Sequence, residues 1–116
     1  MLTQEVLKNL ALSFPETTED AHFEKIAFKV KNKIFATFDA MHNRLCVKLS
    51  EIDQDVFERT NNKIIYAVDN KWGKKGWTNI EMAKVNEDVF IDVLTSAYCE
   101  VAPKKLADQI RNKDNI

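Results

Sequence analysis

Residues 71–77, with the sequence Lys-Trp-Gly-Lys-Lys-Gly-Trp, carry the side chains most suited to binding chemistry. This segment contains both tryptophans and both glycines of the 116-residue chain. Lys71, Lys74 and Lys75 could contact phosphates, and a tryptophan could stack on a base or a sugar. The glycines would let backbone N–H groups approach a ligand closely. The composition of the segment therefore favours nucleic-acid binding.

The same segment also has a purely structural interpretation. It could connect two strands, with Trp77 sealing the edge of the sheet and the lysines solvated. Trp77 begins a predicted strand and is expected to pack, whereas Trp72 is expected to be exposed. A further alternative is an enzyme or small-ligand domain in which this segment covers a pocket.

Basic side chains also gather on the predicted strands. Residues 25–48 carry six basic side chains and one acidic one, whereas residues 81–102 carry five acidic and one basic. Along the strands, basic residues alternate with apolar ones, so they would share one face of a sheet. That face could be a phosphate-binding platform built from Lys29, Lys31, Arg44 and Lys48. The alternative is ordinary solvated lysine, which also guards strand edges against aggregation.

Patterns for catalysis or metal binding are missing from the sequence. His22 and His42 each lie within a few residues of an aspartate, but a metal site needs a closer set of ligands. One acidic group could be compared with the iron-binding ridge of frataxin, although it is looser and mostly in a loop: Glu16, Glu19, Asp20 and Glu24. We therefore expect a non-enzymatic protein with no catalytic residues, no metal and no cofactor.

The remaining composition is that of an ordinary globular chain. The net charge is −1, and 45% of the residues are hydrophobic. No apolar run reaches the roughly 18 residues of a membrane span, and the first residues lack a basic signal-peptide region. Cys46 and Cys99 match no zinc or redox motif and are expected to be reduced, in or near a core. We expect one cytoplasmic domain over residues 1–116, with no membrane contact.

Hydrophobic periodicity predicts the elements that must position these residues. Alternation with a period of two predicts strands over residues 26–31, 34–38, 44–49, 64–68 and 77–82. Helical spacing predicts helices over residues 4–14, 51–61, 87–101 and 104–112. Caps are expected at Thr3, Ser50 and Asn86. The acidic residues 15–20 are expected to form a loop, because Pro15 ends the first helix.

Within these elements, periodicity also assigns faces. The second strand is expected to place on one face Ile34, Ala36 and Phe38. Phe35 then falls on the other face with Thr37. The apolar stripe of the second helix is expected to contain Ile52, Val56 and Phe57. Tyr98, on the stripe of the long helix, is expected in the core with its hydroxyl hydrogen-bonded.

The element order α-β-β-β-α-β-β-α-α predicts an α+β fold in two layers. Its simplest form is an antiparallel five-stranded sheet with the helices on one face. The basic segments are strands and the acidic segments are mostly helices. The two layers are therefore expected to differ in charge, which matters for partners more than the total charge does.

Several residue clusters stand in a recognisable order between about Leu10 and Lys105: residues 15–19, 28–30, 33–36, 45–49, 76–77, 96–98 and 104–105. These clusters and the element order resemble the MmcQ/YjbR family. The resemblance implies a two-layer fold similar to type III secretion chaperones and, more loosely, to bacterial frataxin. It also implies a small cytoplasmic protein that binds DNA through a double-wing motif, with no catalytic residue to carry over. Trp72 departs from the tyrosine or similar residue expected of the family.

Two hypotheses about function follow. The first is a non-enzymatic binding domain that meets DNA through the basic sheet face and residues 71–77. The alternative is a protein-interaction or chaperone-like domain that acts through a sheet face or a dimer interface. The sequence leaves the oligomeric state open.

Overall fold

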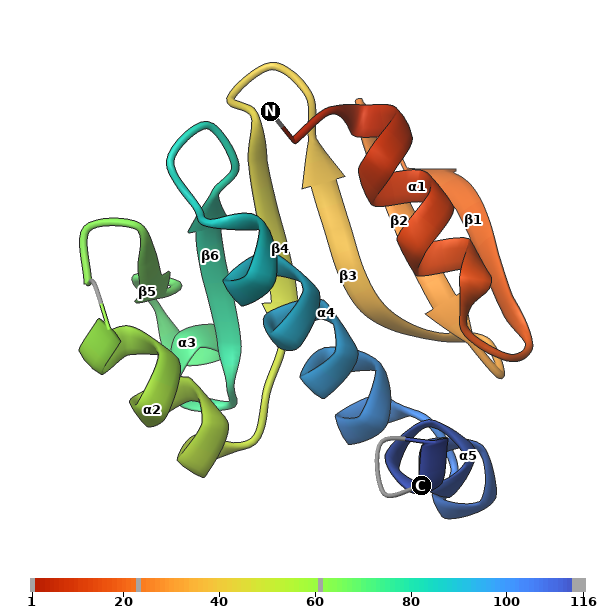
Figure 1. Cartoon of the computed structure of the whole chain (residues 1–116). Coiled ribbons are helices and arrows are strands. Elements are labelled where there is room, and N and C mark those ends of the chain that lie inside the picture. The colour runs from red at the N-terminus through yellow and green to blue at the C-terminus, as the bar shows by residue number, and fades with distance from the viewer. Residues whose placement is uncertain (1, 23, 61, 114–116) are drawn as a thin grey trace.

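A computed structural model gives the fold of residues 2–22, 24–60 and 62–113 (Figure 1). Within these residues, six strands form one antiparallel sheet in the order β1-β2-β3-β4-β6-β5. The strands are β1 (Thr17–His22), β2 (Lys25–Val30), β3 (Lys33–Asp39), β4 (Arg44–Lys48), β5 (Ile65–Ala67) and β6 (Trp77–Glu81). The helices are α1 (Gln4–Ser13), α2 (Glu51–Thr60), α3 (Lys71–Lys74), α4 (Glu87–Val101) and α5 (Lys104–Lys113).

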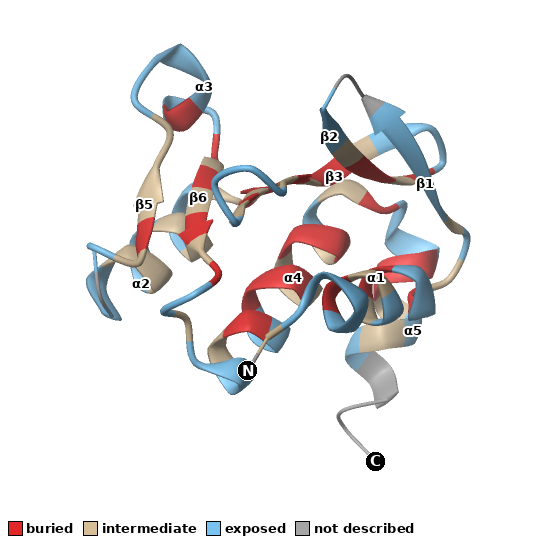
Figure 2. Cartoon of the chain, turned by 90° about the horizontal axis from the view of Figure 1, so that it is seen from above, coloured by how far each residue is buried: buried red, intermediate tan, exposed pale blue. Residues whose placement is uncertain are grey.

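Four of these helices lie on one side of the sheet, and the short α3 lies on the other (Figures 1 and 2). α4 packs across β3 and β4, α1 covers β1, and α2 lies beside β5. The α+β class and the antiparallel sheet are confirmed. The expected five strands and nine-element order are wrong, because β1 and α3 are additional elements. No helix in the described part of the chain is long and apolar enough to cross a membrane.

The acidic residues predicted as a loop form the edge strand β1 instead. Glu16 has a positive φ of 58° and turns the chain after α1, so that Thr17 pairs with Val30 of β2. The Thr17 hydroxyl donates to the Phe14 carbonyl at 2.9 Å and closes this turn. An edge strand needs no apolar alternation, and its charges oppose strand addition by another chain. The usual periodic signal of a strand is therefore missing from β1.

A β-bulge in β3 overturns the predicted faces of that strand. Lys29 of β2 pairs with Ile34, but the preceding Phe28 pairs with Ala36, so Phe35 is an extra residue. Phe35 and Ala36 are both fully buried. The extra residue shifts the alternation by one, so Ile34 does not share the buried face of Ala36 and Phe38.

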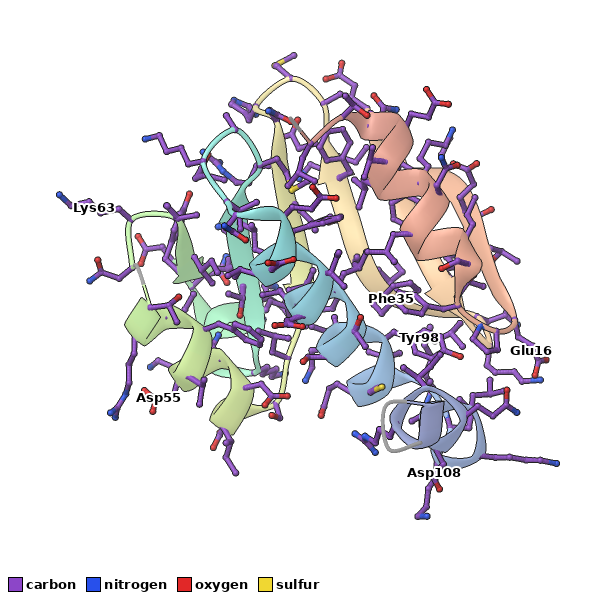
Figure 3. The ribbon with its side chains drawn as sticks, in the orientation of Figure 1. Glu16, Phe35, Asp55, Lys63, Tyr98 and Asp108 are labelled. Carbon is purple, nitrogen blue, oxygen red and sulfur yellow. The ribbon has the colours of Figure 1, made fainter. Side chains whose placement is uncertain are left out.

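The extra phenylalanine joins an aromatic cluster between β3, α1 and α4. The Phe14 and Tyr98 rings stack at 4.7 Å, and Phe35 meets both edge-on at 6.3 and 5.6 Å. Figure 3 shows Phe35 and Tyr98 between their two elements. The Tyr98 hydroxyl donates to the Pro15 carbonyl at 2.8 Å, so its predicted core position with a bonded hydroxyl is confirmed. This cluster fixes α4 on the sheet.

α2 is attached mainly by polar contacts, contrary to the prediction. Ile52 and Val56 are 77% and 54% exposed, and α2 has no buried residue in the described structure. The Gln54 side-chain amide donates to the Gly73 carbonyl at 2.9 Å and to the Thr78 hydroxyl at 3.1 Å. Phe57 packs partly against the core. The predicted stripe is therefore correct only at Phe57, and α2 is fastened to α3 and β6.

The three predicted helix caps are confirmed. Thr3 accepts the Val6 N–H at 3.2 Å, Ser50 accepts the Asp53 N–H at 3.1 Å, and Asn86 accepts the Asp88 N–H at 2.8 Å. Side-chain oxygens at these positions satisfy N–H groups that the first helical turn leaves free. The apolar stripe predicted for α4 also faces the core: Val89 and Val101 at its ends are half-buried, and the residues between them are buried, namely Phe90, Val93, Leu94, Ala97 and Tyr98.

Candidate binding site on the open face of the sheet

The open face is defined here as the side of the sheet that α4 does not cover. In β4 and β6, cross-strand pairs place on this face Arg44 with Glu81, Cys46 with Asn79, and Lys48 with Trp77. Figure 2 shows α3 and the β1–β2 end of the sheet both rising away from α4. The open face is therefore concave, with α3 at one end and β1–β2 at the other.

A shallow hollow of about 430 Å³ lies on this face beside α3. It is lined by Ile34, Thr37, Cys46, Val68, Trp72 and Trp77. Most of this lining is apolar. Burial raises the pKa of the Cys46 thiol to about 11, so the thiol stays protonated at neutral pH. The hollow therefore offers ring and aliphatic contacts rather than a reactive group.

Residues 71–77 place Trp72 at the rim of this hollow. The predicted loop contains the single turn α3, whose cap Asn70 accepts the Trp72 N–H at 2.8 Å. A Cβ on Gly73 would lie 1.9 Å from the Val68 carbonyl oxygen. Gly76 has a φ of 107°, and a Cβ there would lie 1.9 Å from the Leu49 carbonyl oxygen. Both glycines are required by the close approach of protein backbone.

The glycine N–H groups are engaged inside the protein. Gly73 donates to the Asn70 carbonyl and Gly76 to the Gly73 carbonyl, both at 3.1 Å. These bonds replace the ligand contacts that the sequence suggested. The two glycine N–H groups are therefore not available to a ligand, and the side chains of residues 71–77 are the better candidates for contact.

Two lysines flank the exposed tryptophan. Trp72 is 49% exposed, and the Nζ atoms of Lys71 and Lys75 lie 5.5 and 5.0 Å from its ring centroid. At this separation the ammonium groups are attracted to the ring face. Trp77 is half-buried at the start of β6, so both tryptophan predictions agree with the structure. Trp72, Lys71 and Lys75 form one cluster, which is called the Trp72 cluster below.

Lys74 lines a different hollow, of about 540 Å³, between α2 and α3. Glu58 and Asp69 also line it, so this hollow carries both signs of charge. The Glu58 carboxylate accepts the outward N–H of Ala67 in β5 at 2.6 Å. This bond occupies a donor on the β5 edge, which would otherwise be available to another strand.

The four predicted basic residues of the strands each lie in an ion pair. The pairs are Lys29–Asp20 at 2.8 Å, Lys31–Glu16 at 2.6 Å, Arg44–Glu81 at 2.9 Å and Lys48–Glu100 at 3.7 Å. Lys31 also has a positive φ of 50° and lies in the turn between β2 and β3. Their charges are therefore locally balanced. These four residues are spread along the sheet, and the predicted platform is not one cluster.

The sequence does not predict the hydrogen-bonded network that Arg44 and Tyr66 form at Glu81. Tyr66 of β5 donates its hydroxyl to the same carboxylate oxygen that accepts from Arg44. Partial burial works to raise the pKa of Glu81, but these two hydrogen bonds outweigh it and hold the pKa below its ordinary value. The signal was indirect: Arg44 and Glu81 pair only once the β4–β6 register is known.

Histidine and acidic side chains form pairs, such as His42 with Asp39, rather than larger clusters among the described side chains. His42 Nδ1 lies 2.7 Å from Asp39 Oδ2, and hydrogen bonding from His42 lowers the pKa of Asp39. The side chain of His22 and all of residue 23 lie outside the described residues. Among the described side chains, no group of three or more His, Cys, Asp or Glu could hold a metal ion.

Known proteins resemble this chain in sequence and fold. A family model described as YjbR matches residues 12–100. The crystal structure of Deinococcus radiodurans protein DR2400, which carries a domain described as DUF419, is similar with a TM-score of 0.75. The two sequences are 23% identical, and the similarity covers 87% of this chain and 79% of that one. At this identity the likeness establishes the fold alone. No curated protein matches the sequence significantly.

Proposed function

We propose that this chain, which belongs to the YjbR family, is a binding domain that takes DNA on the open face of its sheet. The observation that carries the proposal is the Trp72 cluster beside the apolar hollow. DNA combines phosphates, which bind lysines, with flat bases, which stack on aromatic rings. The cluster and the hollow together offer both kinds of contact.

Electrostatics favour residues 71–77 over the strands as the main contact. Lys71, Lys74 and Lys75 lie in none of the ion pairs between described residues, whereas the four strand residues all do. A paired lysine must give up its partner, or share it, before it can bind a phosphate. With a net charge of −1, the affinity should be modest and should fall steeply as salt rises.

Charge reversal at the segment tests the proposal. Lys71→Glu with Lys75→Glu, which reverses both lysines of the Trp72 cluster, should weaken binding of a labelled duplex at low salt by roughly tenfold or more. It should also reduce the slope of log affinity against log salt by about two, one for each lost phosphate contact. Fluorescence anisotropy measures both quantities.

The matched control is Lys104→Glu with Lys105→Glu on α5, on the opposite side of the sheet. This control changes the net charge by the same amount as the double variant in residues 71–77, and it should keep most of the affinity for the duplex. If the natural protein shows no binding that weakens with salt, the DNA proposal is wrong. Equal losses in both double variants would mean that only total charge matters.

A second candidate, protein binding through the same face, rests on the apolar lining of the hollow. Both sheet edges oppose strand addition, since β1 is charged and Glu58 occupies an N–H of β5. A protein partner would therefore use the face rather than an edge. Light scattering over a range of concentrations tests the dimer form of this candidate. A mass that stays at one chain throughout would exclude that form.

A further inference from the structure

We infer that the open face takes single-stranded nucleic acid in preference to the duplex, by stacking a base on Trp72 and seating rings in the adjoining hollow. The inference rests on the proposed function and specifies the form of its partner. Three observations carry it: the exposed ring of Trp72, the shallow apolar hollow beside the short α3, and a track of alternating basic and apolar contacts.

The first observation is the exposed ring of Trp72. The residue is 49% exposed, and the Nζ atoms of Lys71 and Lys75 lie over its ring at 5.5 and 5.0 Å from the centroid, where they could turn to the phosphates of a stacked nucleotide. In a duplex the faces of the bases are covered by their neighbours, and a protein meets mainly base edges and phosphates. In a single strand the faces are available, and aromatic side chains stack on them without regard to sequence. An exposed ring beside an apolar hollow therefore suits a single strand better than a duplex.

The second observation is the shape of the site. Proteins that read a duplex insert a helix or a two-stranded ribbon into the major groove. α3 has only four residues, and a shallow apolar hollow lies beside it. Bases splayed out from a flexible strand can lie flat against this lining, whereas the faces of bases in a duplex are covered by their neighbours.

The third observation is that the hollow continues into another. A neighbouring hollow of about 270 Å³ shares Ile34 and Trp77 with the first, and its lining also includes Lys33 and Lys48 together with Glu100 and Val101 of α4. The track therefore runs from the lysines of the Trp72 cluster, across apolar side chains, to two more lysines. Within the described residues Lys33 lies in no ion pair, while Lys48 faces Glu100 at 3.7 Å. Rings between cationic ends match a short strand of nucleotides, whose phosphates flank its bases.

Sequence discrimination should be weak along this track. Among the residues that line the main hollow, those with a polar group in the side chain are Thr37, Cys46 and the two tryptophans, and none is charged at neutral pH. Distinguishing bases takes several fixed donors and acceptors aimed at base edges. We therefore expect the site to accept most base compositions.

The test compares one strand with its duplex at equal low salt. The probes are a labelled oligothymidylate of about ten nucleotides, a mixed-sequence strand of the same length and the duplex of that strand. The natural protein should bind both single strands roughly tenfold or more tightly than the duplex. Trp72→Ala should weaken single-strand binding by roughly tenfold, since stacking supplies that much per base, and should change duplex binding far less.

Trp72→Phe is the conservative control, because it keeps a stacking ring while removing the indole. It should retain most of the single-strand affinity, and circular dichroism should show all variants folded, since position 72 is half exposed. In a Trp77→Phe background, the emission of Trp72 should be quenched by the single strand.

Each other outcome has a distinct meaning. Equal affinity for strand and duplex, with equal losses in Trp72→Ala, would overturn the single-strand preference and leave the DNA proposal standing. Full single-strand affinity in Trp72→Ala would overturn the stacking mode, because lysines alone would then account for binding. If no probe binds, both the inference and the proposed function are wrong.

Discussion

Trp72 and Trp77 stand five positions apart, but the backbone around them gives them different surroundings. Trp77 lies in β6 opposite Lys48 and is half covered by the sheet. Trp72 lies in a turn in which Gly73 and Gly76 approach the backbone carbonyls of Val68 and Leu49 closely. The glycines and Trp77 are thus explained by packing. Packing does not explain why Trp72 and the two lysines beside it are found in this segment, because these side chains are exposed.

At the same scale, Glu81 should show a pH dependence that can be traced to one hydroxyl. The folded pKa of Glu81 is lower than in the unfolded chain. Its contribution to stability is therefore present above the unfolded pKa and is lost as pH falls through the folded one. Tyr66→Phe removes one of the two hydrogen bonds that lower the pKa, so the Glu81 pKa should rise. NMR titration of the Glu81 carboxyl carbon measures it directly.

Tyr98→Phe is the control for this titration. It also removes a tyrosine hydroxyl, but that hydroxyl donates to the Pro15 carbonyl and not to Glu81. The Glu81 pKa should be the same as in the natural protein. An unchanged Glu81 pKa in Tyr66→Phe would mean that the hydroxyl does not stabilise the carboxylate.

Elements with an ordinary apolar pattern could be predicted from the sequence, and elements held by other contacts could not. α4 buries its predicted stripe because a single apolar face dictates how it packs. β1 is held by backbone pairing with β2 and by ion pairs such as Asp20–Lys29, and its threonines and acids show no apolar alternation. The bulge at Phe35 depends on the pairing of β2 with β3, which periodicity within one strand does not contain.

α2 gives the clearest test of this distinction. Ile52→Gln with Val56→Gln should change the free energy of unfolding by less than about 1 kcal/mol, because both side chains are exposed. Gln54→Ala should cost about 1–3 kcal/mol, because it leaves the Gly73 carbonyl and the Thr78 hydroxyl without this donor. Urea denaturation measures both changes. If the double variant loses more free energy of unfolding than Gln54→Ala does, then α2 is held by its apolar residues instead.

Over the whole molecule, many of the basic and acidic side chains that cluster along the sequence form ion pairs with each other. Basic residues of the strands meet acids of neighbouring elements, such as Lys29 with Asp20 on β1 and Lys48 with Glu100 on α4. The expected contrast between a basic layer and an acidic layer is therefore weakened. Among the described residues near the open face, lysines outside these ion pairs include those of the Trp72 cluster, Lys74 on the α2 side of α3, and Lys33 in the neighbouring hollow.

The candidate site could be predicted only in part. The exposure of Trp72 and its lysine neighbours followed from the composition of one short segment. The hollow could not be predicted, because it is assembled from residues of β3, β4, β6 and the segment after β5. Ile34 belongs to it only through the bulge, which moved this side chain off the buried face predicted for it. Long-range pairing, rather than local pattern, builds this surface.

The central claim is that nucleic acid binds the open face. The most direct measurement is amide and indole NMR of the ¹⁵N-labelled protein during titration with a single-stranded oligonucleotide of about ten nucleotides. Binding to the open face should give large shifts at Trp72, Ile34 and Cys46, which line the hollow, and little change at Ile52 and Ile91 on the helical side. Shifts concentrated on α2 or α4, or none on the open face at saturation, would contradict it.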